Sequence, residues 1–187
     1  MAEDRKPWTW ARVARRIRVP LGFLFAALYV WLAHPAWWST GAGAAVSLVG
    51  VWIRAIASGH VKKNEELTTT GPYGYTRNPL YLGSIVIAIG FAIAARNLWV
   101  GIGLVALFLF IYLPVIRSEE EFLRGKFANF DDYVSRVPRL IPRLTSASNE
   151  GGAFSRELYL RHREYNALAG TLLLVCALIG KLLWYSR

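Results

Sequence analysis

Five apolar runs, each at or near the length needed to cross a lipid bilayer, most constrain how this chain can fold. They cover residues 20–38, 41–57, 80–95, 98–116 and 166–184. The hydrocarbon core of a bilayer is about 30 Å thick, and an α-helix needs roughly 20 residues to cross it. The second and third runs are short, but local thinning of the bilayer accommodates such helices. The sequence therefore predicts an all-α, polytopic membrane protein of about five transmembrane helices.

The basic residues are placed unevenly along the chain. There are 22 lysines and arginines against 12 acidic residues, a formal net charge of +10. Nearly all of the basic residues precede the first run or lie in the segments 54–79 and 117–165, whereas the connections at 34–40 and 96–97 carry one arginine between them. This asymmetry follows the positive-inside rule and predicts a cytoplasmic N-terminus. The charge then indicates attraction to anionic membrane lipids, and no nucleic acid partner is expected.

The apolar runs and their connections divide the chain into four parts. Residues 1–19 form a basic, tryptophan-containing segment that is expected to lie at the membrane interface. A membrane domain at 20–143 follows, with its functional core expected at 65–143. Residues 144–155 are expected to be a flexible linker, because glycine, serine and other small residues dominate them. The part 156–187 carries the C-terminal transmembrane helix.

A cytoplasmic amphipathic helix is predicted after the fourth run. Pro114 is expected to kink that run or to begin a new helix. Ser118 and Glu121 fit a capping-box start, and Pro138 would end the helix. Apolar residues between these points recur at alternating spacings of four and three, which is typical of one helix face: Leu123, Phe127, Phe130, Val134 and Val137.

Two polar segments, 65–81 and 117–143, flank the third and fourth runs. Only the short connection at 96–97 joins those runs, so they are expected to form a tight hairpin whose opposite ends lie side by side. The RNPLY box at 77–81 and the glutamates at 119–121 should therefore meet at the same membrane depth. Polar groups that converge beside an apolar wall indicate a binding site, and ionisable groups at membrane depth favour function.

Three short motifs follow one another in this region. They are Gly71-Pro72-Tyr73 with Arg77-Asn78-Pro79-Leu80-Tyr81 and Gly83, then Glu119-Glu120 with Leu123, then the VPRLIP segment from Val137 to Pro142. In order and in nearly all spacings they resemble the isoprenylcysteine carboxyl methyltransferases and their relatives among the phospholipid methyltransferases. These are integral membrane enzymes that use S-adenosylmethionine. Their best-known members have histidine where this chain has Asn78, whose amide still donates and accepts hydrogen bonds.

The resemblance implies a role for each motif. Residues that would line the cofactor pocket are Glu65, Glu66, Leu67, Thr68, Tyr73, Asn78, Pro79, Leu80, Tyr81 and Glu119. In the family an arginine just upstream of the glutamates holds the methyl acceptor, and Arg117 is the nearest candidate here. Arg139 is a candidate to bind either the acceptor or a lipid phosphate.

The same side chains suit this chemistry on physical grounds. Tyr73 and Tyr81 offer aromatic faces to a sulfonium. Glu119 can pair with the cofactor's ammonium, and Arg77 can hold its carboxylate. A carboxylate acceptor needs only an arginine, whereas an amine acceptor must lose a proton, and Glu120 or a tyrosine would then be the base. The hydrophilic cofactor would arrive from the cytosol, and a lipophilic acceptor would enter from the bilayer.

Two other functions stay open at this point. Membrane sterol reductases have a similar C-terminal half but bind NADPH, and a non-catalytic membrane adaptor could keep the same fold. No metal site is expected, because the histidines are isolated and the single cysteine, Cys176, lies in an apolar run. Arg54 is expected to snorkel to the membrane surface, and His162 is expected to be solvated.

Overall fold

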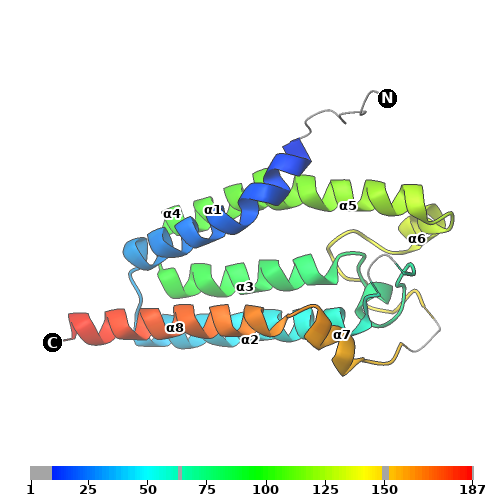
Figure 1. The fold of residues 1–187 in the computed structure, drawn as a ribbon. Coiled ribbons are helices and arrows are strands. Elements are labelled where there is room, and N and C mark those ends of the chain that lie inside the picture. Colours follow the sequence, from blue (N-terminus) through cyan, green and yellow to red (C-terminus); the bar gives the residue numbers. More distant parts are fainter. Residues whose placement is uncertain (1–9, 63–64, 149–151, 187) are drawn as a thin grey trace.

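A computed structural model describes residues 10–62, 65–148 and 152–186, and within these residues the secondary structure is entirely helical (Figure 1). The α-helices are α1 (Trp10–Leu32), α2 (Trp37–His60), α3 (Pro79–Ala95), α4 (Leu98–Leu107), α5 (Leu113–Lys126), α6 (Phe130–Arg136), α7 (Arg156–Arg161) and α8 (Tyr165–Tyr185). A short 3₁₀-helix, η1 (Gly71–Gly74), precedes α3, and a π-helical turn, η2 (Phe108–Tyr112), joins α4 to α5. The all-α prediction is confirmed.

Five apolar helices make up the bundle in the described part of the chain. Three of them are long and apolar enough to cross a membrane, namely Trp37–His60, Leu98–Lys126 and Tyr165–Tyr185. Two shorter apolar helices, Pro20–Leu32 and Pro79–Ala95, complete the set. In Figure 1, α2 and α8 lie side by side, and α3 lies between α2 and the long helix of α4 and α5. This arrangement confirms a polytopic membrane protein.

The first two helices differ from their predicted bounds. α1 begins at Trp10, so the described part of the expected interfacial segment continues the first apolar helix, whereas residues 1–9 lie outside the described residues. α1 ends at Leu32 and not at 38. α2 begins at Trp37, where the Ala36 backbone N–H donates to Ser39 Oγ (3.0 Å). The second helix is therefore 24 residues long and needs no thinning of the bilayer.

The fourth apolar run continues beyond its predicted end at 116. Pro114 has no N–H for the carbonyl oxygen of Phe110, four residues before it. The π-helical turn η2 lies just before this proline, and Trp10 Nε1 donates to the Phe110 carbonyl oxygen (2.8 Å). With that carbonyl group satisfied, the helix runs without a break from Leu98 to Lys126. The predicted helix start at Ser118 and Glu121 is therefore wrong.

The predicted amphipathic helix is also divided in two. α5 ends at Lys126, and α6 begins only at Phe130. Phe127 between them has extended backbone angles (φ −121°, ψ 117°), which reverse the chain so that α6 can pack back. The predicted apolar face still forms one cluster, in which Leu123, Phe127, Phe130, Val134 and Val137 pack with Leu67, Tyr133 and Ala147.

α2 and α3 approach each other closely along a line of small residues. Gly43 and Gly50 of α2 face Gly90 and Gly83 of α3, and a Cβ at either α2 position would clash with the backbone of the facing helix. Small residues allow this close approach, which is a common way for helices to associate in membranes. The tight pair holds the start of α3 beside the end of α2.

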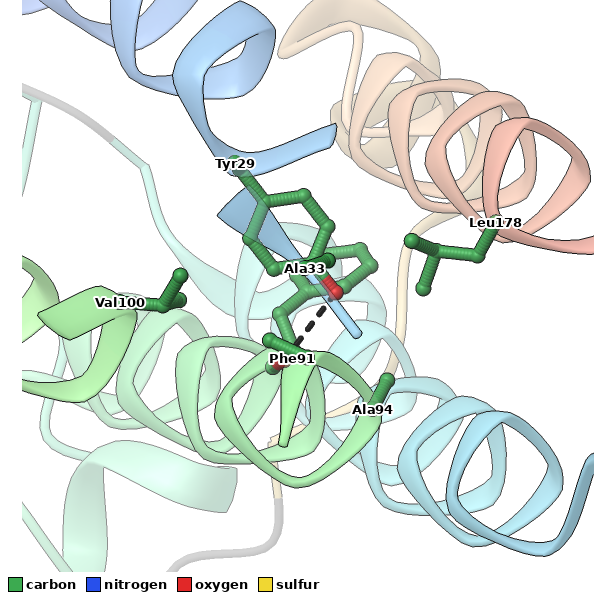
Figure 2. Close-up of a cluster of buried hydrophobic side chains, with 7 residues drawn as sticks. Tyr29, Ala33, Phe91, Ala94, Val100 and Leu178 are labelled. Carbon is green, nitrogen blue, oxygen red and sulfur yellow. Dashed lines mark hydrogen bonds between the residues drawn. The ribbon is translucent and has the colours of Figure 1, made fainter. Parts of the chain in front are cut away.

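The end of the bundle that holds the turns 33–36 and 96–97, here called the hairpin end, has an apolar core (Figure 2). Its buried members are Tyr29, Ala33, Phe91, Ala94, Ala95, Val100 and Leu178. The Tyr29 hydroxyl donates to the Phe91 carbonyl oxygen (3.0 Å). Lys181 Nζ of α8 donates to the carbonyl oxygens of Val30, Trp31 and Ala33 at 2.7 to 2.8 Å. Since a helix leaves its last carbonyl groups unpaired, Lys181 caps the end of α1 and ties α8 to it.

Candidate active site

The opposite end, here called the loop end, holds η1, α6, α7 and the connections between them (Figure 1). The RNPLY box and the glutamates of α5 meet there, as the tight hairpin predicts. Asn78 precedes α3, and its Nδ2 donates to Glu120 Oε1 (3.0 Å). One turn into α3, the Tyr81 hydroxyl donates to Glu119 Oε2 (3.1 Å). Neighbouring glutamates therefore contact two different residues of the box.

Glu120 is the buried centre of this cluster, with 6% of its surface exposed. Arg139 donates to its Oε2 from Nε (2.9 Å), and Arg139 Nη2 lies 2.7 Å from the same oxygen. Arg77 Nε lies 3.3 Å from its Oε1, an ion pair without the alignment of a hydrogen bond. Two guanidinium groups and one amide thus surround the carboxylate, so its geometry fits an anchor between chain segments better than a proton acceptor.

Arg77 is held among the same groups. Its side chain is 9% exposed and faces Glu120, and its Nη1 lies 3.5 Å from the Val134 carbonyl oxygen. The cofactor-carboxylate role expected for Arg77 stays a prediction, as does the role of Glu120 as a base.

The VPRLIP segment and the residues that follow it run along the first motif and are joined to it by backbone hydrogen bonds. Three N–H groups donate across the two segments: Arg77 to the Pro138 oxygen (2.9 Å), Arg143 to the Tyr75 oxygen (3.0 Å) and Ala147 to the Gly74 oxygen (2.9 Å). The buried Thr76 hydroxyl also donates to the Arg139 carbonyl oxygen (3.0 Å). The third motif therefore supports the first two from outside the helical bundle.

Tyr73 lies beneath these segments. It is 8% exposed, and its carbonyl oxygen accepts a hydrogen bond from the Tyr133 hydroxyl (2.7 Å). Burial raises the pKa of Tyr73 well above its ordinary value, and the neighbouring Tyr133 phenol raises this pKa further. Burial likewise raises the pKa of Tyr133. Both phenols therefore stay protonated above pH 10, where an exposed tyrosine ionises.

The stretch before the first motif lies partly against the α6 cluster and partly at the surface, and its cofactor-binding role stays a prediction. Leu67 packs against the α6 cluster, and the buried Thr68 accepts a hydrogen bond from the Lys62 backbone N–H (3.2 Å). Glu65 and Glu66 are exposed, and their ion pairs are with Arg161 (3.6 Å) and Lys62 (3.0 Å) respectively. Arg117 is exposed on α5. These three charged side chains are not part of the Glu120 cluster.

A second ionic cluster escaped the sequence analysis. Arg54 of α2 pairs with Glu164, just before α8, through contacts of 2.7 to 3.0 Å. Its Nη1 donates to Ser84 Oγ (2.6 Å) and to the Leu80 carbonyl oxygen (3.1 Å) of α3. Arg163, before Glu164, has a left-handed backbone (φ 53°) that an L-residue adopts at a cost. Arg54 therefore joins three helices and does not snorkel to the membrane surface. The sequence did contain one indication of this ion pair, because an acidic residue, Glu164, lies at the start of the last apolar run.

The two histidines of this end are also engaged. His162 Nδ1 lies 3.0 Å from the Ser58 carbonyl oxygen and is half-buried, so the expected solvated position is wrong. The two ring nitrogens of His60 each lie near a backbone carbonyl oxygen. Nδ1 is 2.8 Å from that of Ile56, and Nε2 is 3.1 Å from that of Gly152. Among the described residues, no group of three or more His, Cys, Asp or Glu could hold a metal ion.

The expected flexible linker at 144–155 is described only in part, since residues 149–151 lie outside the described residues. On one side of that gap, Ala147 bonds to Gly74. On the other, Ser155 N donates to the Gly59 carbonyl oxygen (2.8 Å), and the Phe154 ring packs edge-on to His60. The flexibility of the segment stays a prediction.

A cavity of about 390 Å³ lies on a different face of α3 from Tyr81. Pro79 and Leu82 line it from α3, and residues of α2 form a second wall. The remaining walls are Gly71, Pro72, Tyr75, Thr76 and Pro142. The first turn of α3 thus separates an apolar cavity from the polar cluster of Glu119 and Glu120.

This combination of an all-helical membrane bundle and a polar cluster at the end of one hairpin matches a known class of membrane proteins. The family model described as phospholipid methyltransferase matches residues 17–129, which is more than half of the chain. The protein belongs to the phospholipid methyltransferase family. The matched region contains the first two motifs and ends before the VPRLIP segment.

Two curated proteins are similar to this chain. The nickel-cobalt-cadmium resistance protein NccN of Alcaligenes xylosoxydans xylosoxydans is 33% identical over 158 residues, covering 75% of this chain and 72% of that protein. The cobalt-zinc-cadmium resistance protein CzcN of Cupriavidus metallidurans is 32% identical over 139 residues, covering 68% of this chain and 62% of that protein. This second match spans less than two thirds of the relative. No solved structure matches the chain.

Proposed function

We propose that this protein transfers a methyl group from S-adenosylmethionine to a lipophilic acceptor in the membrane. The observation that carries the proposal is the pairing of Tyr81, at the start of α3, with Glu119 of α5 (3.1 Å). It lies at the end of two apolar helices in a chain of the phospholipid methyltransferase family.

The two neighbouring glutamates differ in whether their carboxylates are already paired with a positive charge. Glu120 is surrounded by two guanidinium groups, whereas Glu119 is half-buried and forms no ion pair with a described residue. Glu119 is thus a carboxylate that can still pair with an ammonium group. Tyr81 orients it, and the aromatic faces of Tyr81 and Tyr73 would attract a sulfonium, on the order of 1–2 kcal/mol where water is excluded. When bound, the cofactor would supply an activated methyl group, and this chain's contribution would be its positioning.

The acceptor would be bound by arginine. Arg117 is exposed on α5 about one turn before Glu120, and its guanidinium would hold an anionic group that enters from the bilayer surface. Arg139 is 40% exposed beside Glu120 and offers a second contact for a carboxylate or phosphate. These contacts favour the carboxylate of a prenylated cysteine-like or isoprenoid compound, or the head group of a lipid amine. From the placement of the basic residues we assign the N-terminus and this site to the cytoplasmic side, in contact with anionic lipids.

The names of the relatives favour one second candidate. Both NccN and CzcN are named for metal resistance, and neither name states a reaction. This protein could accordingly serve in metal resistance as a membrane adaptor that has kept the fold without the reaction. The adaptor does not need Glu119, whereas the methyltransferase does.

The two candidates are separated by binding and by turnover on the purified protein. Calorimetric titration with S-adenosylhomocysteine is performed on the wild type, on Glu119→Ala and on Glu121→Ala, a control on the same helix whose side chain is exposed. We expect micromolar binding by the wild type and the control, and at least a tenfold loss in Glu119→Ala. Transfer of a labelled methyl group from S-adenosylmethionine into extracted membrane lipids should follow the same order.

Three other results would be informative. Binding without methyl transfer to any lipid fraction favours the adaptor. Failure of the folded wild type to bind S-adenosylhomocysteine overturns the methyltransferase proposal. Stabilisation by NADPH in its place would favour a membrane reductase of sterol-reductase-like architecture.

A further inference from the structure

A short exposed stretch, residues 141–145, follows α6 at the loop end. It carries the two most exposed large apolar side chains of the described residues, Leu144 at 100% and Ile141 at 82%. The next most exposed, Phe23 and Leu98, lie on apolar helices that face the lipid of a bilayer. Ile141 and Leu144 lie on no helix, so their exposure needs another explanation.

Hydrogen bonds to the first motif hold this stretch in place. Just before it, the Arg139 carbonyl oxygen accepts a hydrogen bond from the Thr76 hydroxyl (3.0 Å). Within it, the Arg143 backbone N–H donates to the Tyr75 carbonyl oxygen (3.0 Å). The backbone is therefore fixed on both sides of Ile141, and the exposure of the apolar side chains is a property of the fold.

The stretch lies at the depth where the hydrocarbon of the bilayer ends. α3 has 17 residues and is about 25 Å long, close to the roughly 30 Å of the hydrocarbon core. Arg77 and Arg96 flank this helix, so its first turn lies near the boundary between hydrocarbon and head groups. Pro142 lines the same cavity as Pro79 and Leu82 of that first turn. Its neighbours in the chain are therefore close to the membrane surface.

The charge of the stretch is positive. Arg143 is exposed between Ile141 and Leu144, and its Nη1 donates to the Arg136 carbonyl oxygen (2.6 Å). No carboxylate of the described residues pairs with Arg143, since the nearby Asp132 pairs with Arg136. The Arg143 guanidinium thus keeps its other N–H donors for an anionic oxygen. Apolar side chains beside such an arginine suit the surface of a membrane that contains anionic lipids.

We propose that Ile141 and Leu144 insert into the membrane surface at the loop end, and that Arg143 binds the phosphate of an anionic lipid there. This proposal does not rest on the proposed function. The hydrophobic effect favours the insertion, because two apolar side chains leave water. Since hydrogen bonds tie the stretch to Tyr75 and Thr76, the insertion also holds the first motif at a fixed depth in the membrane.

Fluorescence quenching on the full-length protein tests the proposal. A fluorescent NBD group is attached to single cysteines in a Cys176→Ala background, and the protein is placed in phosphatidylcholine nanodiscs. Ile141→Cys and Leu144→Cys are the test positions. Asp131→Cys, an exposed acidic position on α6, is the water-facing control, and Leu173→Cys on α8 is the lipid-facing control. Each sample is measured with a lipid that carries a nitroxide near the head group and with a nitroxide dissolved in water.

The two quenchers should rank the positions in opposite orders. We expect the lipid nitroxide to quench the probes at 141 and 144 at least twofold more than the probe at 131, and the dissolved nitroxide to do the reverse. Replacing about 30% of the phosphatidylcholine by phosphatidylglycerol should raise the lipid quenching at 144, because the surface then attracts Arg143. Adding Arg143→Gln should remove this rise. Leu144 is fully exposed, so its replacement leaves the packing of the protein intact.

Three results would overturn the proposal. Probes at 141 and 144 that respond to both quenchers as the probe at 131 does would show that the stretch faces water. Probes shielded from both quenchers would show that a second copy of the chain or another protein covers it. Lipid quenching that is the same with and without phosphatidylglycerol, in the presence or absence of Arg143→Gln, would remove the role of Arg143 in binding a lipid phosphate.

Discussion

The hairpin end and the loop end of this bundle are stabilised in different ways. At the hairpin end, short turns join the helices, and the side chains of Tyr29 and Lys181 donate hydrogen bonds to backbone carbonyl oxygens. At the loop end, the chain leaves the helices for long stretches, and the ion pairs of Glu120 and Glu164 hold those stretches and the helices together. The hairpin end has an apolar core, whereas the loop end combines the apolar cluster around α6 with charge pairing.

The difference indicates where function resides. A buried ion pair gives a fold little net stability, because desolvating the two charges costs about as much as their attraction contributes. A bundle that needed only stability could use at its loop end the same packing that it uses around Phe91. Ionisable groups that persist at membrane depth are therefore a stronger indication of a site than of a scaffold.

The largest expected effect is at Glu120. Glu120→Ala leaves the Arg77 guanidinium, with a side chain 9% exposed, without its carboxylate partner. Removing one partner of a buried pair costs about 3–5 kcal/mol. Thermal unfolding in detergent should show this loss, and limited proteolysis should cut first in the segment 137–148, which Arg139 and Arg77 hold in place.

The control for this prediction is the neighbouring exposed residue. Glu121→Ala should change the stability by less than about 0.5 kcal/mol. Equal melting temperatures for the two variants would mean that the Glu120 cluster does not stabilise the loop end.

The next effect concerns the second ionic cluster. Arg54→Met removes the partner of Glu164, whose side chain is 11% exposed. We expect a loss of about 2–3 kcal/mol, less than at Glu120 because the Arg54 side chain is 22% exposed and water can reach the pair. Adding Glu164→Leu should recover part of the loss, since no unpaired charge then remains. A double-mutant cycle on the melting temperatures measures the coupling, and additive effects would contradict the ion pair.

The parts of the fold that sequence reasoning predicted well depend on local patterns. The third and fifth apolar runs, expected at 80–95 and 166–184, agree with α3 and α8 to within one residue at each end. The meeting of the RNPLY box with Glu119 and Glu120 was also predicted, because a short turn between two antiparallel apolar helices brings their other ends to the same side of the membrane.

The parts that were not predicted depend on contacts between distant residues. The partner of Arg54 lies 110 residues later in the chain, and the indole that satisfies the Phe110 carbonyl group lies 100 residues earlier. The break between α5 and α6 was hidden for another reason. Phe127 and Phe130 keep the spacing of a continuous helix across it, because both ends of the break pack into one cluster. The periodicity of the apolar residues therefore predicts the face that they share, but it does not detect the break between α5 and α6.

A third prediction concerns alkaline pH at the loop end. Burial raises the pKa of Tyr73 and of Tyr133 above the ordinary value of 10.0. Above pH 10 the unfolded chain releases these protons while the folded protein keeps them, so the unfolded state binds fewer protons and stability falls as the pH rises. The loss should reach about 1.4 kcal/mol per pH unit for each tyrosine.

Two variants test whether the buried tyrosines cause this pH dependence of stability. Tyr133→Phe removes one of these two groups and should lower the alkaline slope of stability against pH by up to about 1.4 kcal/mol per pH unit, beyond a constant loss from its hydrogen bond to Tyr73. Tyr185→Phe, at an exposed position of α8, should leave the slope as it is. Denaturant titrations between pH 9 and 11 provide the comparison, and identical slopes in both variants would contradict the burial of Tyr133.

The smallest effect is expected at the hairpin end, where Tyr29→Phe removes only the hydrogen bond to the Phe91 carbonyl oxygen. That oxygen lies inside α3 and keeps its intrahelical partner, so no buried acceptor is left unpaired. The edge-to-face contact of the two rings, with centroids 5.5 Å apart, also survives the change. The loss should therefore be about 0.5–1 kcal/mol.

Thermal unfolding of this variant beside Glu120→Ala tests the contrast between the two ends directly. A severalfold smaller shift is expected for Tyr29→Phe, and equal shifts would show that single polar contacts are as important at the packed end as at the charged one.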